Sequence, residues 1–329
     1  MTQGAQTDGG RRTIRVGLDI GGTKTDAVAI TAGGEIIARV RRPSGHGADA
    51  VIAGVVDSVR ELRIDAGFEL DEVRSVGVGI PGLVDAISGR VLHAVNLRVE
   101  SLELAVLAGA ELGVPVAVDN DVNAAALGAA ALRAADLDGP AAHLASMAYL
   151  NLGTGVAAGI VMGGEIWRGA RGTAGEVGHI SVDPAGRLCS CGQRGCIETL
   201  CGGGALARAW GRPGALPVRD IFDAADKGDS EALLLRADLA RGAAAAVRVL
   251  VLSADVERVI IGGGLTALGE RVGDGIRSAL VADAAGSPFL RSLHLDERIE
   301  LLPPGSPAAA VGAALVGAHI PEEETIIHG

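Results

Sequence analysis

Three of the four cysteines lie close together, in a pattern that could bind a metal ion. Cys189, Cys191 and Cys196 follow the spacing C-x-C-x4-C, and His179 precedes them. Three thiolates and one imidazole are the ligand set of a closed, tetrahedral structural zinc site. A chance cluster and a disulfide with one cysteine left over are the alternatives. We disfavour the disulfide because residues 1–12 lack the apolar segment of an export signal.

Two glutamates bracket this segment. Glu176 lies three positions before His179 and Glu198 two positions after Cys196. A metal would hold His179, Glu176 and Glu198 in one rigid arrangement, as acceptors for a ligand with several hydroxyl groups. The alternative is that both glutamates are ordinary solvated surface charges. This segment by itself leaves the choice open.

Two glycine-containing turns have the composition of phosphate-binding loops. In the first, DIGGTK, the glycines let backbone N–H groups approach a phosphate, and the aspartate could hold Mg²⁺. Its residues are Asp19, Gly21, Gly22, Thr23 and Lys24. The second turn consists of Gly153, Thr154 and Gly155. Residues 153–158 also fit the dinucleotide fingerprint, but that motif requires a helix next, and a strand is expected here.

Asp121 is a candidate general base. It lies in VDNDVNAAAL, where a strand gives way to an alanine-rich helix. A carboxylate at this position could accept the proton of an attacking hydroxyl group. It could equally be a first-turn acid that the helix dipole favours.

The elements that must position these residues alternate between strands and helices. Short apolar runs predict strands at 14–20, 27–30, 35–42, 73–80, 91–95, 114–118, 147–152, 156–162, 256–261 and 298–302. Helical periodicity or alanine-rich composition predicts helices at 48–66, 102–112, 121–135, 230–253, 268–284 and 308–318. Both halves open with a strand, a glycine turn containing threonine, and another strand. This repetition predicts an α/β protein of two similar lobes with a ligand cleft between them.

Composition narrows the class of protein further. The 329 residues are 48% apolar but only 2% aromatic, so the core must be built from aliphatic side chains. The net charge of −11 argues against nucleic-acid binding, for which a basic surface is expected. No run of 18 apolar residues occurs, and we expect no membrane association. We therefore expect a cytoplasmic protein whose thiols stay reduced.

Taken together, these motifs resemble the ROK family (repressor, open reading frame, kinase) in its bacterial glucokinase-like branch. The matching segments occur in the family's order and cover roughly residues 14–317. They are DIGGTK at 19–24, GIPGLVD at 79–85, NDVNAAALG at 120–128, LGTGVAAGI at 152–160, GEVGH at 175–179, CSCGQRGCIE at 189–198 and IIGGGL at 260–265.

The resemblance implies an actin/hexokinase-like ATPase fold, with duplicated ribonuclease-H-like lobes and an inserted zinc-binding loop at 179–196. A small lobe is expected at 13–120, completed by a C-terminal helix at 305–320, and a large lobe at 121–304. Residues 1–12 and 321–329 are expected to be disordered or flexible tails.

The resemblance also implies a role for each motif. Asp121 corresponds to the catalytic base. The implied sugar contacts are Asn96, Asn120, Glu176, His179 and Glu198. The implied zinc ligands are His179, Cys189, Cys191 and Cys196. Asp19, Gly21, Gly22, Thr23, Lys24, Gly153, Thr154 and Gly155 would line the phosphates, and Gly262, Gly263 and Gly264 would lie near the adenosine.

Three departures from the family pattern leave the identity of the sugar open. Asp119 stands where glutamate is common, and Ala129 stands where an acid is common. The segment after Asn96 reads NLRV and lacks a tryptophan frequently found there. None of these positions is the base or a metal ligand.

We therefore expect an ATP-dependent kinase for the 6-hydroxyl of a hexose, most simply glucose, that uses Mg²⁺ and a structural Zn²⁺. Kinases for N-acetylglucosamine, N-acetylmannosamine or mannose are alternatives. A sugar-responsive regulator of the same family is disfavoured, because we expect no helix-turn-helix domain before Ile14. We expect a homodimer or homotetramer.

Overall fold

The computed structural model describes residues 12–137 and 144–318, and they fall into two compact units. The first consists of Met1–Ala135 and Pro307–Gly329, and the second of Asp136–Ser306. The tails expected at 1–12 and 321–329 lie outside the described residues, apart from Arg12. No helix within the described ranges is long and apolar enough to cross a membrane.

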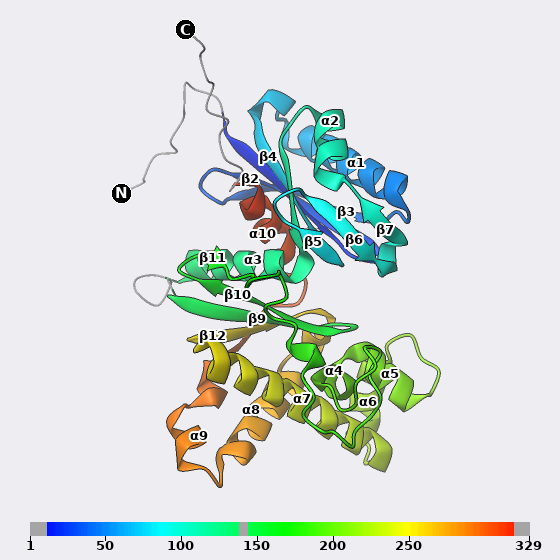
Figure 1. Ribbon diagram of the computed structural model, residues 1–329, viewed down its shortest axis with the longest axis vertical. Helices are drawn as coiled ribbons and strands as arrows, with labels where there is room; N and C mark the ends of the chain where they lie inside the picture. Colours follow the sequence, from blue (N-terminus) through cyan, green and yellow to red (C-terminus); the bar gives the residue numbers. More distant parts are fainter. Residues whose placement is uncertain (1–11, 138–143, 319–329) are drawn as a thin grey trace. The chain divides into compact units, whose positions relative to one another are not determined.

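A five-stranded sheet in the order β3-β2-β1-β4-β8 forms the centre of the first unit (Figure 1). Its strands are β1 (Ile14–Ile20), β2 (Lys24–Thr31), β3 (Ile36–Pro43), β4 (Val73–Ile80) and β8 (Val116–Asn120). The three strands β3, β2 and β1 are antiparallel, whereas β1, β4 and β8 are parallel. A small antiparallel sheet also belongs to this unit: β5 (Leu83–Asp85), β6 (Arg90–Ala94) and β7 (Val99–Leu102).

The second unit repeats this design. Its sheet has the order β11-β10-β9-β12-β13, with the same succession of two antiparallel and two parallel pairings. The strands are β9 (Ser146–Leu152), β10 (Val156–Met162), β11 (Glu165–Ile166), β12 (Arg258–Gly262) and β13 (Ile299–Leu301). The shared strand order confirms the duplicated α/β lobes that the repeated sequence pattern predicts.

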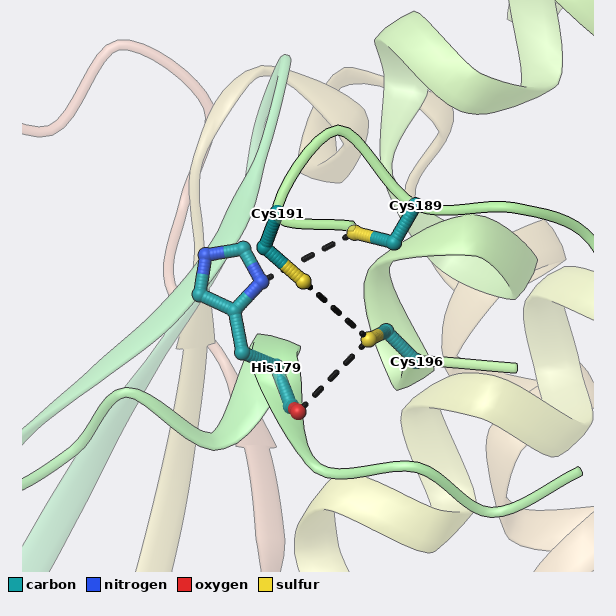
Figure 2. Close-up of side chains that lie close together, drawn as sticks. All are labelled: His179, Cys189, Cys191 and Cys196. Carbon is teal, nitrogen blue, oxygen red and sulfur yellow. Dashed lines mark hydrogen bonds between the residues drawn. The ribbon is translucent and has the colours of Figure 1, made fainter. Parts of the chain in front are cut away.

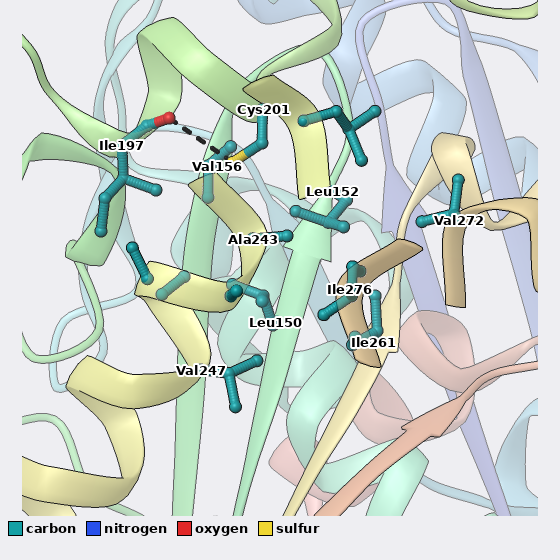
Figure 3. Close-up of a cluster of buried hydrophobic side chains, with 14 of the residues drawn as sticks. Leu150, Leu152, Val156, Ile197, Cys201, Ala243, Val247, Ile261, Val272 and Ile276 are labelled. Carbon is teal, nitrogen blue, oxygen red and sulfur yellow. Dashed lines mark hydrogen bonds between the residues drawn. The ribbon is translucent and has the colours of Figure 1, made fainter. Parts of the chain in front are cut away.

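Helices cover the sheets of both units. The first unit contains α1 (Ala48–Ala66), α2 (Leu104–Leu112), α3 (Asp121–Asp136) and α10 (Ala308–Gly317). The second contains α4 (Ile197–Cys201), α5 (Gly203–Trp210), α6 (Pro217–Ala225), α7 (Ser230–Ala254), α8 (Glu270–Ala284) and α9 (Pro288–Ser292). The aliphatic core of the second unit packs α7 and α8 against the sheet, through Ala243, Val247 and Ile276 among others (Figure 3).

Glycines, which have no side chain, let α10 pack tightly in the first unit. A Cβ at Gly17 of β1 or at Gly77 of β4 would lie 2.0 or 1.7 Å from a backbone oxygen of α10. A Cβ at Gly128 of α3 would lie 1.7 Å from the backbone oxygen of Ala308. Because α3 is joined to α10 in this way, it groups with the first unit. The boundary therefore falls after Ala135, whereas the sequence-based division placed it after residue 120, before α3.

Two local differences from the sequence-based elements occur around the small sheet. The run at 102–112 gives a helix only from Leu104, because Val99–Leu102 pairs with β6 as a strand. The strand expected at 114–118 is found at Val116–Asn120, where it pairs with β4. Pairing with β6, which directly precedes β7 in the chain, decided the first boundary. Pairing of Val116 with the distant Val76 of β4 decided the second.

Candidate active site

The four predicted metal ligands converge in the second unit (Figure 2). Cys189 Sγ lies 3.8 Å from His179 Nδ1, and Cys191 Sγ lies 3.6 Å from Cys196 Sγ. All four ligand atoms lie within 4.8 Å of one another. Zinc–sulfur bonds of about 2.3 Å in a tetrahedron place ligand atoms about 3.7 Å apart. The donor set and its spacing therefore fit a zinc ion.

Local backbone contacts bring these ligands together. Cys196 immediately precedes α4, and its neighbour Ile197 donates its N–H to the carbonyl of Ile180, next to His179, at 3.0 Å. Isolated bridges pair Ser181 with Cys196 and Leu188 with Arg194. The two ends of the loop are thus joined by backbone hydrogen bonds.

The electrostatics of the thiols also favour a cation. The backbone N–H of Gln193 is the main cause that lowers the pKa of Cys191 to about 6. Burial raises the pKa of Cys196 to about 12. A divalent ion supplies the charge that a buried thiolate needs, because metal binding displaces the thiol proton. Cys201, also buried, lies outside the ligand cluster, and its thiol donates to the carbonyl of Ile197.

The GEVGH segment lies against strand β10. A Cβ at Gly175 would be 1.8 Å from the backbone oxygen of Ala158, and one at Gly178 would be 2.0 Å from that of Val156. The N–H of Ala158 donates to the carbonyl of Gly175 at 2.7 Å. The two glycines therefore allow the approach that places Glu176, which is exposed, and His179 beside β10.

Glu198 connects the metal loop to the second glycine turn. It lies on α4, and its Oε2 accepts a hydrogen bond of 3.0 Å from the N–H of Val156, directly after Gly153–Gly155. A carboxylate that accepts this backbone bond has a fixed orientation. Glu198 is therefore more than a solvated surface charge.

Three further glycines complete this turn, and the sequence analysis did not identify them. They form the run Gly202–Gly204 at the start of α5. Gly203 and Gly204 donate their N–H groups to the carbonyls of Gly153 and Thr154, at 2.8 and 2.9 Å. Three consecutive glycines shortly after the proposed metal loop were the available signal, because such a run indicates close backbone approach.

The glycines proposed to lie near adenosine are beside the same turn. A Cβ at Gly263 would be 2.5 Å from both the side-chain oxygen of Asn151 and the backbone oxygen of Leu152. Gly262 ends β12, which pairs with β9. The second unit thus gathers Gly262–Gly264, Gly153–Gly155 and Glu198 around the ends of β9 and β12.

The remaining candidate residues lie in the first unit. Asp121 begins α3 directly after β8, and its Oδ1 accepts the N–H of Val122 at 3.0 Å. Asn120 accepts the same N–H at 2.9 Å and donates its side-chain amide to the carbonyl of Gly82 at 3.3 Å. Asp119, 2% exposed, accepts from Asn120 and from the side chain of Asn123. Asp119, which stands where the family commonly has glutamate, is therefore a buried residue that orients this segment.

The first glycine turn joins β1 to β2. The N–H of Gly21 donates to the carbonyl of Lys24 at 2.9 Å, which closes the turn and leaves Thr23 and Lys24 exposed. A Cβ at Gly22 would lie 3.1 Å from the Cβ of Asn96. The structure therefore brings Asn96, from the segment after β6, next to this turn.

Asp19, at the end of β1, has an unusual ionisation. Burial raises its pKa to about 7, and the charges of Asp121 and Asp26 contribute to the rise, against a smaller opposing effect of Lys24. Asp26 itself is paired with Arg39 at 2.6 Å and Arg41 at 3.0 Å. Asp19 and Asp121 are thus neighbouring carboxylates at the ends of β1 and β8, a donor set that suits a hard cation such as Mg²⁺.

Comparison with known proteins gives consistent relatives. The model of the ROK family matches residues 15–316. A glucokinase of Halalkalibacterium halodurans is 32% identical over 274 residues, covering 78% of this chain and 81% of the relative. A ROK hexokinase structure from Thermus thermophilus is 30% identical with a TM-score of 0.75, covering 93% of this chain and 98% of that one.

A second solved structure is a ROK family glucokinase from Streptomyces griseus in complex with glucose and AMPPNP. It is 30% identical with a TM-score of 0.72, and the match covers 93% of this chain and 99% of that one. The actin/hexokinase-like fold implied by the sequence motifs is therefore confirmed. With the family model matching nearly the whole chain, this protein belongs to the ROK family.

Proposed function

We propose that this protein is an ATP-dependent kinase that phosphorylates the 6-hydroxyl of a hexose, and that the hexose is glucose. The observation that carries the proposal is the likeness over 93% of the chain to a glucokinase in complex with glucose and AMPPNP. The glucokinase relative at 32% identity supports the same activity.

In this proposal, Asp121 accepts the proton of the sugar hydroxyl while the hydroxyl oxygen attacks the γ-phosphoryl group of ATP in line. Its position supports the role, because Asp121 is the first residue of α3 and directly follows the last residue of β8. Asp19 is a neighbouring carboxylate whose raised pKa marks it as a site for positive charge. Asp19 would hold Mg²⁺, which supplies charge neutralisation at the phosphates when bound.

We assign sugar binding to Asn96, Asn120, Glu176, His179 and Glu198. Carboxylate, amide and imidazole groups can together accept and donate hydrogen bonds to several hydroxyl groups. His179 presents Nδ1 to the thiols, so its Nε2 is directed away from them (Figure 2). His179, Cys189, Cys191 and Cys196 would hold a structural zinc ion, which when bound would fix the tautomer and the orientation of the His179 ring without taking part in the transfer.

We assign phosphate binding to the backbone N–H groups of the two glycine turns, with Thr23 and Lys24 adding a hydroxyl and a charge. Gly262, Gly263 and Gly264 would contact the adenosine. Support comes from the second unit, where Gly263 lies against Leu152 at the start of Gly153–Gly155.

The decisive experiment is a coupled assay of ADP release by the zinc-loaded protein with Mg²⁺ and ATP. Glucose, mannose, N-acetylglucosamine, N-acetylmannosamine and fructose are compared at equal concentrations, and the product is mapped by NMR. We expect the highest kcat/KM with glucose and phosphate on its 6-oxygen. A higher value with an N-acetylated sugar would replace glucose by that substrate. No turnover with any sugar would overturn the kinase assignment.

We also propose that the protein acts in the cytoplasm as a homodimer or homotetramer. None of the four cysteines forms a disulfide, which suits a reducing compartment. Light scattering at micromolar concentration would give the oligomeric state, and a monomer would contradict this proposal.

A further inference from the structure

Helix α7 carries the face against which α4 packs. A Cβ at Gly242 of α7 would lie 2.7 Å from the Cβ of Leu200 and 3.1 Å from that of Cys201, so α4 makes direct contact with α7. One turn earlier on α7 is Asp238, a carboxylate that is only 8% exposed. A buried carboxylate requires a charged or hydrogen-bonding partner.

Arg187 of the metal loop provides that partner. Its guanidinium group donates to Asp238 of α7 and, through its other terminal nitrogen, to the carbonyl of Thr199 on α4 at 2.9 Å. A planar guanidinium that bonds two partners at once fixes their relative position. Arg187 therefore ties the metal loop, α4 and α7 to one another.

From α4 the connection continues to the turn Gly153–Gly155. Glu198 of α4 accepts the N–H of Val156 at 3.0 Å, and Gly203 and Gly204 donate to the carbonyls of Gly153 and Thr154. In a planar trans peptide, the carbonyl and the following N–H point in opposite directions. Holding these two carbonyls therefore aims the N–H groups of Thr154 and Gly155 away from α5.

We infer that Arg187 is a positioning residue for the donor-phosphate turn. It holds α4, and the glycines that follow α4 orient the two N–H groups that receive the phosphate. The inference rests on the proposed function, because it takes Gly153–Gly155 as the turn that binds ATP. The sequence motifs assign no role in binding or catalysis to Arg187.

The chain offers a matched control. Arg241 donates to the other oxygen of the same Asp238 carboxylate, but it lies on α7 itself, three residues away. Arg187→Ala and Arg241→Ala each remove one guanidinium partner from Asp238. Only the first breaks the link to Thr199 and the metal loop. Arg187→Lys keeps the positive charge but lacks the planar guanidinium group that can donate to two partners at once.

Hydrogen exchange of the zinc-loaded proteins, read at residues 153–158 and 202–206, tests the inference without requiring catalysis. In Arg187→Ala we expect exchange faster by about tenfold or more, since one charge-assisted hydrogen bond is worth about that factor in local opening. Arg241→Ala should exchange like the wild type, and Arg187→Lys should lie between them. Equal exchange in all four proteins, or equal acceleration in both alanine variants, would overturn the inference.

Steady-state kinetics provide a second measurement. Arg187→Ala should raise the KM for ATP by about fivefold or more, because misaimed donors weaken phosphate binding. A purely structural role would instead lower the amount of active enzyme, and hence the apparent kcat, at unchanged KM. If the wild type phosphorylates a sugar and Arg187→Ala keeps its KM for ATP, the inference fails while the kinase assignment stands. If the wild type phosphorylates no sugar, the kinase assignment fails. The exchange data then still show whether Arg187 holds the turn at residues 153–155.

Discussion

Asp121 occupies a position at which a carboxylate can serve either of two purposes. It begins α3, where the helix dipole favours negative charge, and it neighbours Asp19 at the end of β1. Asp49 is a first-turn acid of α1 outside any proposed site. The two aspartates therefore allow the helix-dipole effect to be separated from catalysis.

We expect Asp121→Asn to lower kcat by about 10²–10⁴-fold, the usual contribution of a general base. Binding of the sugar should change much less, because asparagine still accepts a hydrogen bond. Asp49→Asn should keep normal turnover and lose about 0.3–1 kcal/mol of stability at most. Steady-state kinetics and thermal melts of both variants measure this. Turnover of Asp121→Asn within about fivefold of wild type would exclude general-base catalysis by this residue.

Asp19 should make the stability of the protein depend on pH. Its pKa is raised from 3.8 to about 7 in the folded state, mainly by burial, so the folded state holds a proton that the unfolded state releases. Stability from this residue is thus fully present below about pH 4 and is lost as pH rises to about 7, by an amount on the order of 1–4 kcal/mol.

Chemical denaturation of the wild type and Asp19→Asn from pH 4 to 8, without Mg²⁺, tests this expectation. The variant lacks the titrating carboxyl group, so its unfolding free energy should fall less over that range. Parallel pH profiles for the two proteins would show that Asp19 has an ordinary pKa.

At the scale of elements, the contact between α3 and α10 depends on absent side chains. Gly128 of α3 and Gly312 of α10 each lie where a Cβ would come within 1.7 Å of a backbone oxygen of the other helix. Glycine inside a helix normally weakens it, so these positions serve packing rather than helix formation. The same packing assigns α3 to the first unit.

We expect Gly128→Ala to destabilise the protein by about 2 kcal/mol or more, because the added methyl group meets backbone that cannot move aside. Gly54→Ala is the control: Gly54 lies inside α1, and a Cβ added there would meet no atom within 4 Å. This change should stabilise by about 0.5–1 kcal/mol, the helix propensity difference. Urea unfolding of both variants gives the two free energies. Equal effects would mean that α3 and α10 separate readily.

For the whole molecule, the candidate metal site belongs to one of two units of the same design. The sheets share one strand order, but the ligand cluster His179, Cys189, Cys191 and Cys196 lies in the second unit. Metal removal should therefore affect the two units unequally. The main apolar cluster of the first unit is built from buried residues between Ile14 and Val118, outside the metal loop.

We expect the wild type to bind about one zinc per chain, and Cys191→Ser to lose it, since a closed site needs all four ligands. Hydrogen exchange should accelerate at residues 176–204 and stay unchanged at 14–134. Cys201→Ala, which removes a buried thiol outside the cluster, should keep its metal. Elemental analysis with exchange measurements decides the outcome. Full metal content in Cys191→Ser would remove this residue from the ligand set.

The sequence by itself determined the class of fold, the repeated lobes and the four residues that form the candidate metal site. These follow from local signals: apolar runs of strand length, glycine turns, and thiols separated by one and four residues. Such patterns depend on neighbours along the chain, so they can be read without coordinates. The ROK resemblance added the roles of Asp121 and the sugar contacts, which stay proposals.

Only the tertiary structure decided what depends on residues distant in sequence. Pairing with β4 set the bounds of β8, and contact with α10 assigned α3 to the first unit. Hydrogen bonds from Gly203 and Gly204 to the turn at 153–155, and from Arg187 to Asp238, join segments about 50 residues apart. Sequence spacing carries no record of such contacts, because they form only when the packed elements bring the partners together.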